Sequence, residues 1–256
     1  MHGPLSSEEQ DLLALLPIIS RARGSRLYTP NGSRWLDLYA DNGRALMGHR
    51  PGGISLRLKN ELDRGLYAPY PNPWPPRLAK ALHHLFPGYQ SARIYRSLER
   101  ALQSTGSPTP PTDPLDLPPS TEKIPGSAWG RPLLPRLPQS DYLFPILPLP
   151  GFDEVQCVLY AREHTALPPS DPISPLILAA LTRACTTLVN PKLQARGTAP
   201  PPWEMRGPYM LYRGTPAEYP SLFETMFKRR ILIAPSFQRP SIYPLEISPG
   251  EAALMN

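Results

Sequence analysis

The sequence predicts an α+β fold in which short strands alternate with helices. Apolar residues recur at helical spacing, as in Leu78, Ala81, Leu82 and Leu85 at i, i+3, i+4 and i+7. Short apolar runs such as residues 231–233 are typical of strands. Proline makes up 38 of the 256 residues, about 15% against roughly 5% in ordinary proteins. Because an interior proline removes a helix hydrogen bond, we expect few long uninterrupted helices.

The first hundred residues contain the most regular patterns. Ser6 or Ser7 is placed to cap a helix that carries several leucines and ends near residues 21–24. Asn31-Gly32 lies between two strand-like runs, 27–29 and 34–38, and this arrangement is a strong hairpin signal. The next elements are, in order, a helix over 55–64, a helix opened by Pro75-Pro76 and ended by Pro87-Gly88, a strand over 92–95 and a helix start over 97–102.

The character of the chain changes between residues 104 and 151. Thirteen prolines fall between Pro108 and Pro150, and no helical or alternating pattern survives. Residues 104–120 read as a linker or mobile loop with polyproline-like backbone. The second half carries Trp129, Tyr142 and Phe144, and this much apolar surface predicts extended chain wrapped over a core. We therefore divide the chain into residues 1–103, 104–151 and 152–256, and expect the first and third segments to pack as one domain.

Regular elements return after the proline-rich segment. Residues 155–160 predict a strand, and Ser174 is predicted to cap a helix over 175–188 with proline in its first turn. A strand over 208–212 is followed by a Thr215–Glu218 capping box, although Pro220 disturbs the first turn and favours a later helix start. The strand over 231–233 and a Ser248–Glu251 capping box complete the chain.

Charge and cysteine content favour a cytoplasmic protein that binds neither membranes nor nucleic acid. The net charge is +6, but the basic residues are scattered, and the run of residues 228–230 suits a helix C-terminus. Cys157 and Cys185 have no metal or redox spacing, so we expect a reducing compartment. The first ten residues lack the layout of a signal peptide, and no stretch approaches the ~20 apolar residues that span a bilayer.

Three motifs follow one another in the order found in a known family. Residues 29–37 read T-P-N-G-S-R-W-L-D, residues 46–51 read L-M-G-H-R-P and residues 229–236 read R-R-I-L-I-A-P-S. They resemble the "D-G-x-x-Y-x-D", "L-G-H-x-x-P" and "L-x-x-R-G-V-x-x-P-S" motifs of class III aminotransferases, notably glutamate-1-semialdehyde aminomutases. These are pyridoxal-phosphate (PLP) enzymes of fold type I. The resemblance implies an α/β remnant that keeps small-domain elements from both chain ends, with the proline-rich middle replacing most of the large PLP domain.

The resemblance also implies where PLP would be held. Ser97-Leu98-Glu99-Arg100-Ala101 stands in place of the family's "S-G-T-E-A", which places Ser97 at the cofactor phosphate. Lys123 resembles the Schiff-base lysine, and Asp153 resembles the carboxylate that faces the pyridine nitrogen. Two departures weaken this cofactor site. Leu98 adds bulk and Glu99 adds an anion where the phosphate would lie, and the carboxylate follows the lysine in this chain whereas it precedes the lysine in the family.

Other candidate residues have simpler structural interpretations. His49 follows Gly48 in a turn and is a structural hydrogen-bonding residue rather than a catalytic base. His83-His84 lack a third ligand at metal spacing. The aromatic stretch 67–74 suits packing or a dimer contact better than base stacking.

Three functional hypotheses follow. We interpret the chain as a divergent, shortened class III aminotransferase-like protein without transaminase activity of its own, and as a homodimer like the family. The alternative is an active PLP-dependent aminotransferase or aminomutase that acts on a small amino or keto acid. A basic nucleic-acid-binding module is the third class, and its binding would weaken steeply with salt.

Overall fold

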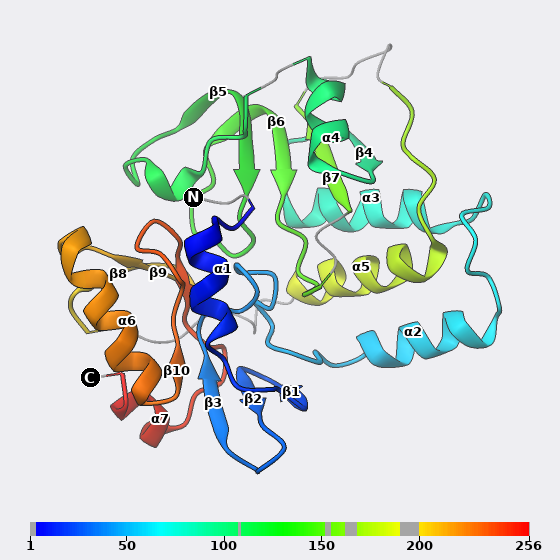
Figure 1. Ribbon diagram of the computed structural model, residues 1–256. Coiled ribbons are helices and arrows are strands. Elements are labelled where there is room, and N and C mark those ends of the chain that lie inside the picture. The colour runs from blue at the N-terminus through cyan, green and yellow to red at the C-terminus, as the bar shows by residue number, and fades with distance from the viewer. Residues whose placement is uncertain (1–3, 107–108, 152–154, 162–167, 190–199, 256) are drawn as a thin grey trace. The chain divides into compact units, whose positions relative to one another are not determined.

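The computed structural model describes residues 4–106, 109–151, 155–161, 168–189 and 200–255, and within these it forms two compact units. The first unit combines residues 4–51, 133–135 and 200–255, and the second combines the described residues of 52–132 and 136–189. Each unit has its own strands and helices (Figure 1). Among the described residues, none of the helices has the length and hydrophobicity of a membrane-spanning segment.

The first unit is built on a four-stranded sheet that joins the two ends of the chain. The sheet has the order β1-β2-β3-β10, with β3 and β10 parallel and Leu36 opposite Ile231. Its strands are β1 (Arg21–Arg23), β2 (Arg26–Tyr28), β3 (Arg34–Asp37) and β10 (Ile231–Leu232). A smaller sheet has the order β11-β9-β8 and consists of β8 (Trp203–Arg206), β9 (Tyr209–Tyr212) and β11 (Ser241–Ile242). The helices of this unit are α1 (Ser7–Ala14), α6 (Tyr219–Lys228) and α7 (Pro249–Ala253).

Local sequence explains how β2 and β3 pair. Leu27 lies opposite Trp35 in the antiparallel register, and the intervening turn is closed by hydrogen bonds between Thr29 and Ser33. Gly32 has a φ of +83°, which glycine adopts readily. The hairpin predicted from Asn31-Gly32 is therefore confirmed.

The second unit is a four-stranded sheet accompanied by helices. The sheet order is β4-β7-β6-β5, formed by β4 (Ser91–Tyr95), β5 (Lys123–Gly130), β6 (Gln139–Pro145) and β7 (Gln156–Tyr160). The helices are α2 (Ile54–Asp63), α3 (Trp74–Leu85), α4 (Leu98–Thr105) and α5 (Pro175–Leu188). Helix α5 packs against α2 and α3 and buries eight of its own residues.

The proline-rich middle is more structured than its sequence suggested. Instead of a linker, residues 109–120 contain a short 3₁₀ turn (Pro114–Asp116), and Asp113 and Leu115 are buried. The chain that follows forms β5 and β6, with Trp129 and Phe144 in the core. A register shift between Ile124 and Ser127 accommodates Pro125, because a bulge leaves no ladder hydrogen bond for proline to donate. Extended chain over a core was predicted here, but its pairing into a sheet was not.

The other differences concern where helices begin and end. Helix α1 starts after the predicted cap, Ser6, but it ends at Ala14 instead of near residues 21–24, which form β1. The prediction of a Thr215–Glu218 capping box was wrong, because no side-chain cap bond forms and a 3₁₀ turn (Pro216–Glu218) precedes α6. The later helix start inferred from Pro220 is confirmed. The Ser248–Glu251 capping box is present with both of its hydrogen bonds.

Candidate functional site

Of the three residues suggested for PLP, the structure describes Ser97 and Lys123, and both belong to the second unit. Ser97 is the N-cap of α4, and its exposed side-chain oxygen accepts the Arg100 N–H at 3.1 Å. Leu98 is partly buried against the Trp129 and Phe144 cluster, and Glu99 is exposed in the first turn of the helix. Asp153 lies outside the described residues.

Lys123 begins strand β5 at the edge of the sheet. Its side chain is exposed and lines a cavity of about 240 Å³ together with Tyr89, Gln139, Ser140 and Asp141. The Tyr89 hydroxyl and the Ser140 hydroxyl are hydrogen-bonded at 3.0 Å. Burial raises the pKa of Tyr89, although Ser140 opposes this shift, so the phenol stays protonated at neutral pH. The cavity is small and polar, with one ammonium and one carboxylate on its wall.

The strand register shows how Lys123 and Ser97 are placed in the sheet. Strands β4 and β6 are both antiparallel to β7, so they run in the same direction. Ser91 and Tyr142 both pair with Tyr160, so these two residues lie at the same position along the strands. Lys123 pairs with Gln139, three residues before Tyr142, whereas Ser97 follows the last residue of β4. Lys123 therefore lies at the end of the sheet where β4, β5 and β6 begin, and Ser97 lies beyond the opposite end. The structure does not bring these two residues together.

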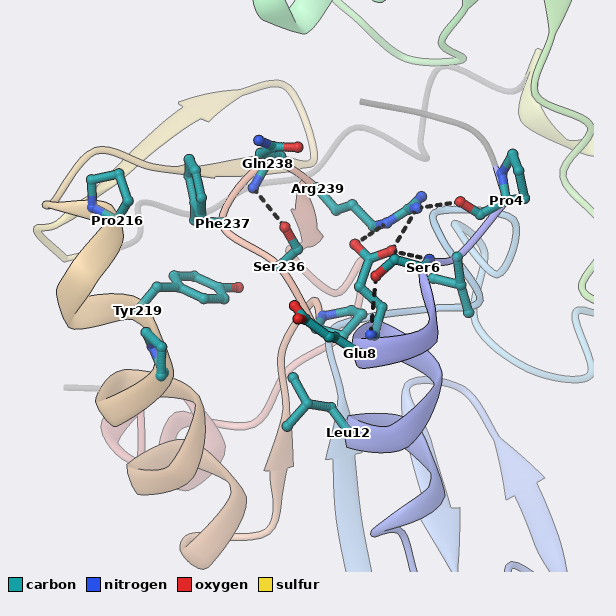
Figure 2. A pocket seen from close by; sticks show the side chains of 14 residues that line it. Pro4, Ser6, Glu8, Leu12, Pro216, Tyr219, Ser236, Phe237, Gln238 and Arg239 are labelled. Carbon is teal, nitrogen blue, oxygen red and sulfur yellow. Dashed lines mark hydrogen bonds and ion pairs between the residues drawn. The ribbon is translucent and has the colours of Figure 1, made fainter.

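The first unit contains a larger cavity of about 690 Å³ (Figure 2). Its walls are the N-terminal part of α1, the start of α6 and the loop over residues 235–239. A second cavity of about 310 Å³ shares Leu12, Tyr219, Pro220 and Pro235 with the first, so the two are neighbours between α1 and α6. Most of the lining of the larger cavity is apolar, and its charged side chains are Glu8, Glu9 and Arg239, whereas Glu224 lines the smaller cavity.

Arg239 and Glu9 form the charged end of this cavity. The Arg239 side chain is only 4% exposed, and its Nε and Nη2 donate to the two carboxylate oxygens of Glu9 at 2.7 and 2.9 Å. Nη2 also donates to the Pro4 carbonyl at 2.8 Å. Burial disfavours the charged form of Glu9, but hydrogen bonds from Arg239 and the Ser6 backbone outweigh burial and lower the pKa of Glu9. Both side chains are thus ionised at neutral pH in a bidentate pair.

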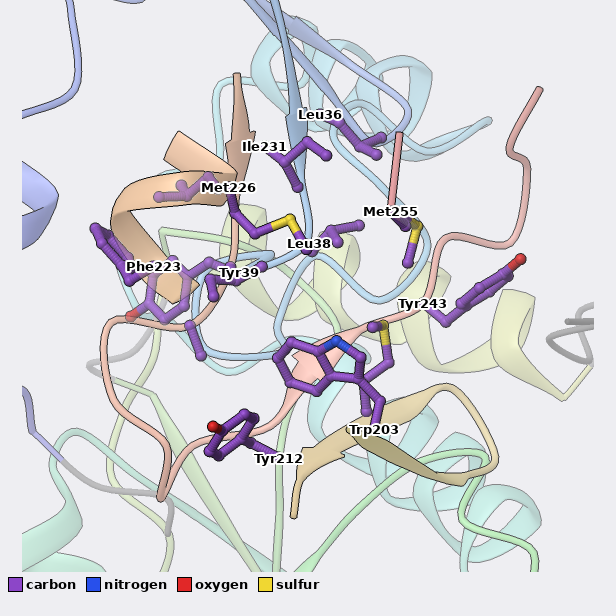
Figure 3. Close-up of a cluster of buried hydrophobic side chains, with 14 of the residues drawn as sticks. Leu36, Leu38, Tyr39, Trp203, Tyr212, Phe223, Met226, Ile231, Tyr243 and Met255 are labelled. Carbon is purple, nitrogen blue, oxygen red and sulfur yellow. The ribbon is translucent and has the colours of Figure 1, made fainter. Parts of the chain in front are cut away.

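Aromatic rings form the wall that α6 and the 235–239 loop contribute. The Tyr219 ring packs edge-on against Tyr212 and Phe237, with centroids 4.9 and 6.4 Å away, and its hydroxyl donates to the Ala234 carbonyl at 2.8 Å. Burial raises the pKa of Tyr219, so it remains a neutral donor. Phe223 and Met226 on the next turns of α6 belong to the buried cluster of the unit (Figure 3). This core fixes α6, whereas the Phe237 ring is 37% exposed beside the cavity.

Neither Glu9 nor Arg239 was a candidate in the sequence. They are 230 residues apart, and no local pattern links them. The available signal was that Glu9 stands three residues after Ser6 and completes a capping box, which the structure confirms. Its second role as partner of Arg239 depends on the fold.

His49 has the structural role expected for it. Its Nε2 lies 2.7 Å from Asp37 Oδ2, and its backbone exchanges two hydrogen bonds with Gly24. Asp37 also accepts the Ala40 N–H, and the turn that follows has positive φ at Ala40, Asp41 and Asn42. Asp37 and His49 thereby hold together both ends of a strained turn.

Comparison with known proteins places the chain among distant relatives. No family model matches it. It is 28% identical over 251 residues to an uncharacterised protein of Borreliella burgdorferi, covering 94% of this chain and 89% of that protein. It is 32% identical over 168 residues to an uncharacterised protein of Treponema pallidum, covering 65% and 51% of the two chains. A third match is the glutamate-1-semialdehyde 2,1-aminomutase of Heliobacterium modesticaldum, at 33% identity over 86 residues, 34% of this chain and 20% of that protein.

Similar solved structures are aminotransferases. The acetylornithine aminotransferase of Elizabethkingia anophelis matches with a TM-score of 0.62 and 11% identity, over 93% of this chain and 91% of that one. An omega-transaminase of Sphaerobacter thermophilus matches with a TM-score of 0.60 and 12% identity, over 97% and 94%. The ornithine aminotransferase of Toxoplasma gondii matches with a TM-score of 0.57 and 12% identity, over 94% and 88%. The chain therefore has the fold of class III aminotransferases, and part of it is a weak homologue of a glutamate-1-semialdehyde aminomutase.

Proposed function

We propose that this chain is a divergent aminotransferase-like protein that does not catalyse transamination on its own. One observation carries the proposal: the strand register separates Lys123 from Ser97. Transamination with PLP needs a lysine that forms the Schiff base and a phosphate site within one cofactor length of it.

The distance between Lys123 and Ser97 is large compared with the length of PLP. Along the strand direction, Lys123 lies three residues before the position that Tyr142 and Ser91 share. Tyr95, the last residue of β4 before Ser97, lies four residues after that position. At about 3.3 Å per residue this gives an offset of roughly 23 Å along the strands, to which three strand spacings of about 4.8 Å add a sideways component. A lysine side chain and one substituted pyridine ring do not span this gap.

The N-terminus of α4 also differs from a phosphate site. A helix N-terminus attracts an anion when its backbone N–H groups are accessible and no side chain blocks them. Here Ser97 Oγ accepts the Arg100 N–H, Leu98 replaces glycine in the first turn, and Glu99 contributes a negative charge. Ser97, Leu98 and Lys123 therefore do not fit PLP bound in the manner of the family.

The fold supports the remaining parts of the proposal. One of the similar structures is described with PLP at its active site, so PLP is the cofactor to test here. We infer a homodimer because aminotransferases commonly form dimers. We infer a cytoplasmic location because Cys157 and Cys185 are both buried as free thiols, which suits a reducing compartment.

Turnover measurements test the proposal. The full chain would be saturated with PLP and supplied with ornithine, N-acetylornithine or alanine as amino donor and a keto acid as acceptor, beside an active ornithine aminotransferase as positive control. We expect no product above the rate of free PLP. Turnover that Lys123→Ala abolishes and Lys59→Ala leaves unchanged would overturn the proposal and support the active enzyme. Lys59 is a matched control because it is an exposed lysine on α2.

A further inference from the structure

We propose that the two neighbouring cavities between α1 and α6, together called the α1–α6 groove, bind an amphiphilic organic cation, which is an ammonium group on an apolar chain. The groove is lined by residues of the first unit alone. A quaternary ammonium nitrogen carries no hydrogen, so such a cation neither forms a Schiff base nor donates an amino group. Its binding is therefore independent of transamination.

One side of α1 changes from charged to apolar along the groove. Glu8, Leu12 and Leu15 are spaced i, i+4 and i+7, so their side chains lie on the same side of the helix. Glu8 lines the larger cavity, Leu15 lines the smaller one and Leu12 lines both. Figure 2 shows Glu8 and Leu12 on the side of α1 that faces α6. At a rise of about 1.5 Å per residue, Glu8 and Leu15 lie roughly 10 Å apart along the helix axis.

The wall that α6 contributes is aromatic and held in place by ring packing. Tyr219, Phe223 and Phe227 are spaced i, i+4 and i+8, and all three line the smaller cavity. Phe227 stacks on Phe223 with ring centroids 5.9 Å apart, and it packs edge-on against Trp35 at 4.7 Å. Because these contacts fix the rings, the apolar part of the groove exists before a ligand arrives. An alkyl chain placed there gains apolar contacts with both helices.

The charges of the groove determine the sign of the ligand. Glu9 is paired with Arg239, and Glu224 in the smaller cavity is paired with Lys228 at 2.7 Å. Glu8 is exposed, and among the described residues it has no hydrogen-bond or ion-pair partner. One uncompensated carboxylate therefore lies beside an apolar space, in a chain whose net charge is +6. An ammonium at Glu8 with its chain directed into the smaller cavity matches both parts of the groove, whereas an anionic ligand would meet like charge.

The N-terminus of α1 does not favour an anion in this position. Ser6 N–H donates to the Glu9 carboxylate at 2.8 Å, and Glu9 N–H donates to Ser6 Oγ at 3.2 Å. Glu8 and Glu9 also place two carboxylates in the first turn. The positive end of the helix dipole is thus already compensated, and Glu8 is left to bind a cation.

Calorimetric titration of the full chain with octyltrimethylammonium, kept below its micelle-forming concentration, tests this assignment. We expect one binding site per chain. Octanoate carries a similar chain with the opposite charge, and tetramethylammonium carries the charge without the chain. Both should bind at least about tenfold more weakly than octyltrimethylammonium.

Two pairs of variants locate the site. Glu8→Gln removes the carboxylate and Leu15→Ser removes apolar surface from the groove, so each should weaken binding by at least about threefold. Asp11→Asn and Ile18→Ser are the matched controls, because both side chains are exposed on or next to α1 and line neither cavity. The two controls should bind like the wild type. All four side chains are exposed, so the substitutions leave the fold intact.

Four outcomes would overturn the proposal. The wild type could give no heat of binding at millimolar probe, or octanoate could bind as tightly as octyltrimethylammonium. Equal affinities of Glu8→Gln, Leu15→Ser and the wild type would place the bound cation outside the groove. If a second copy of the chain covers the groove instead, the wild type would not bind the probe, and Leu15→Ser would shift the chain towards monomer in sedimentation velocity, whereas Ile18→Ser would not.

Discussion

Arg239 holds the carboxylate of Glu9 with two parallel hydrogen bonds, Nε to Oε1 at 2.7 Å and Nη2 to Oε2 at 2.9 Å. Replacing Glu9 with glutamine keeps the side-chain size but leaves the charge of a buried guanidinium without its counter-ion. We expect Glu9→Gln to lower the free energy of unfolding by about 2–3 kcal/mol. Urea denaturation measures this change.

The neighbouring Glu8 provides the control for Glu9. Glu8 is exposed and lines the same cavity, so Glu8→Gln should change the free energy of unfolding by less than about 0.5 kcal/mol. Equal effects of the two substitutions would mean that Arg239 gains nothing specific from Glu9.

A second ion pair predicts how the stability depends on pH. Arg26 donates from Nε to Glu251 Oε1 at 2.7 Å, and this hydrogen bond lowers the pKa of Glu251 from 4.5 to about 2, against the opposing effect of burial. Because the pKa is depressed in the folded state, the stabilisation is complete above pH 4.5 and is lost as the pH falls from 4.5 towards 2. A shift of this size corresponds to a loss of about 3 kcal/mol.

Denaturation midpoints between pH 2 and 6 test the contribution of Glu251. In the wild type the free energy of unfolding should fall with decreasing pH, and Glu251→Gln should flatten part of that slope and lower the stability at pH 6. An unchanged slope in Glu251→Gln would assign the acid sensitivity to other carboxylates, such as Glu9.

Asp113 and Arg131 form a deeply buried pair in the second unit. Arg131 is 1% exposed and donates from Nε to Asp113 Oδ1 at 2.7 Å. Burial opposes ionisation of Asp113, but Arg131 outweighs burial and holds the pKa of Asp113 well below its usual range. Asp113→Asn should therefore cost about 3–5 kcal/mol, because the arginine charge stays buried.

A double variant separates the pair from its surroundings. Asp113→Ala together with Arg131→Met removes both charges, so it should destabilise the protein by less than the sum of the two single substitutions. Strict additivity in guanidinium denaturation would contradict an energetic coupling between Asp113 and Arg131.

Two glycines differ in how much space surrounds them. Gly48 has a φ of +75°, and a Cβ there would lie 2.7 Å from the Gly24 backbone, beside the hydrogen bonds that tie Gly24 to His49. Gly32 has a φ of +83° but open space around it. Gly32→Ala should cost about 1 kcal/mol from backbone strain, and Gly48→Ala should cost at least about 2 kcal/mol more. Equal melting temperatures for the two variants would contradict this difference.

Sequence patterns correctly predicted the elements that depend only on residues a few positions apart. The α5 helix and the capping box at Ser248 depend only on residues within a few positions of one another, and both are present, although the predicted cap at Ser174 forms no side-chain hydrogen bond. The β2–β3 hairpin follows from its Asn-Gly turn for the same reason. Strands β5 and β6 were not predicted, because Pro125 and Pro145 interrupt the alternating pattern that is typical of a strand. In the structure Pro125 lies at a bulge and Pro145 at the end of β6, where proline is tolerated.

The sites could be predicted only in part, because their residues are far apart in the sequence and are brought into contact only by folding. The resemblance indicated the aminotransferase fold, and similar structures confirm that fold. It also suggested Ser97 and Lys123 for one cofactor, and these suggestions took no account of the strand register. The Glu9–Arg239 pair joins the two ends of the chain across 230 residues. Sequence spacing predicts contacts only between nearby residues, so it could not have predicted this pair.

Cofactor absorbance tests the central proposal most directly. The full chain would be incubated with PLP, separated from free PLP on a desalting column and scanned from 300 to 500 nm, beside Lys123→Ala and Lys59→Ala. We predict no stable imine band after desalting, or a residual band of equal size in all three proteins. A stable imine band that disappears in Lys123→Ala and persists in Lys59→Ala would contradict the proposal and show that Lys123 binds the cofactor.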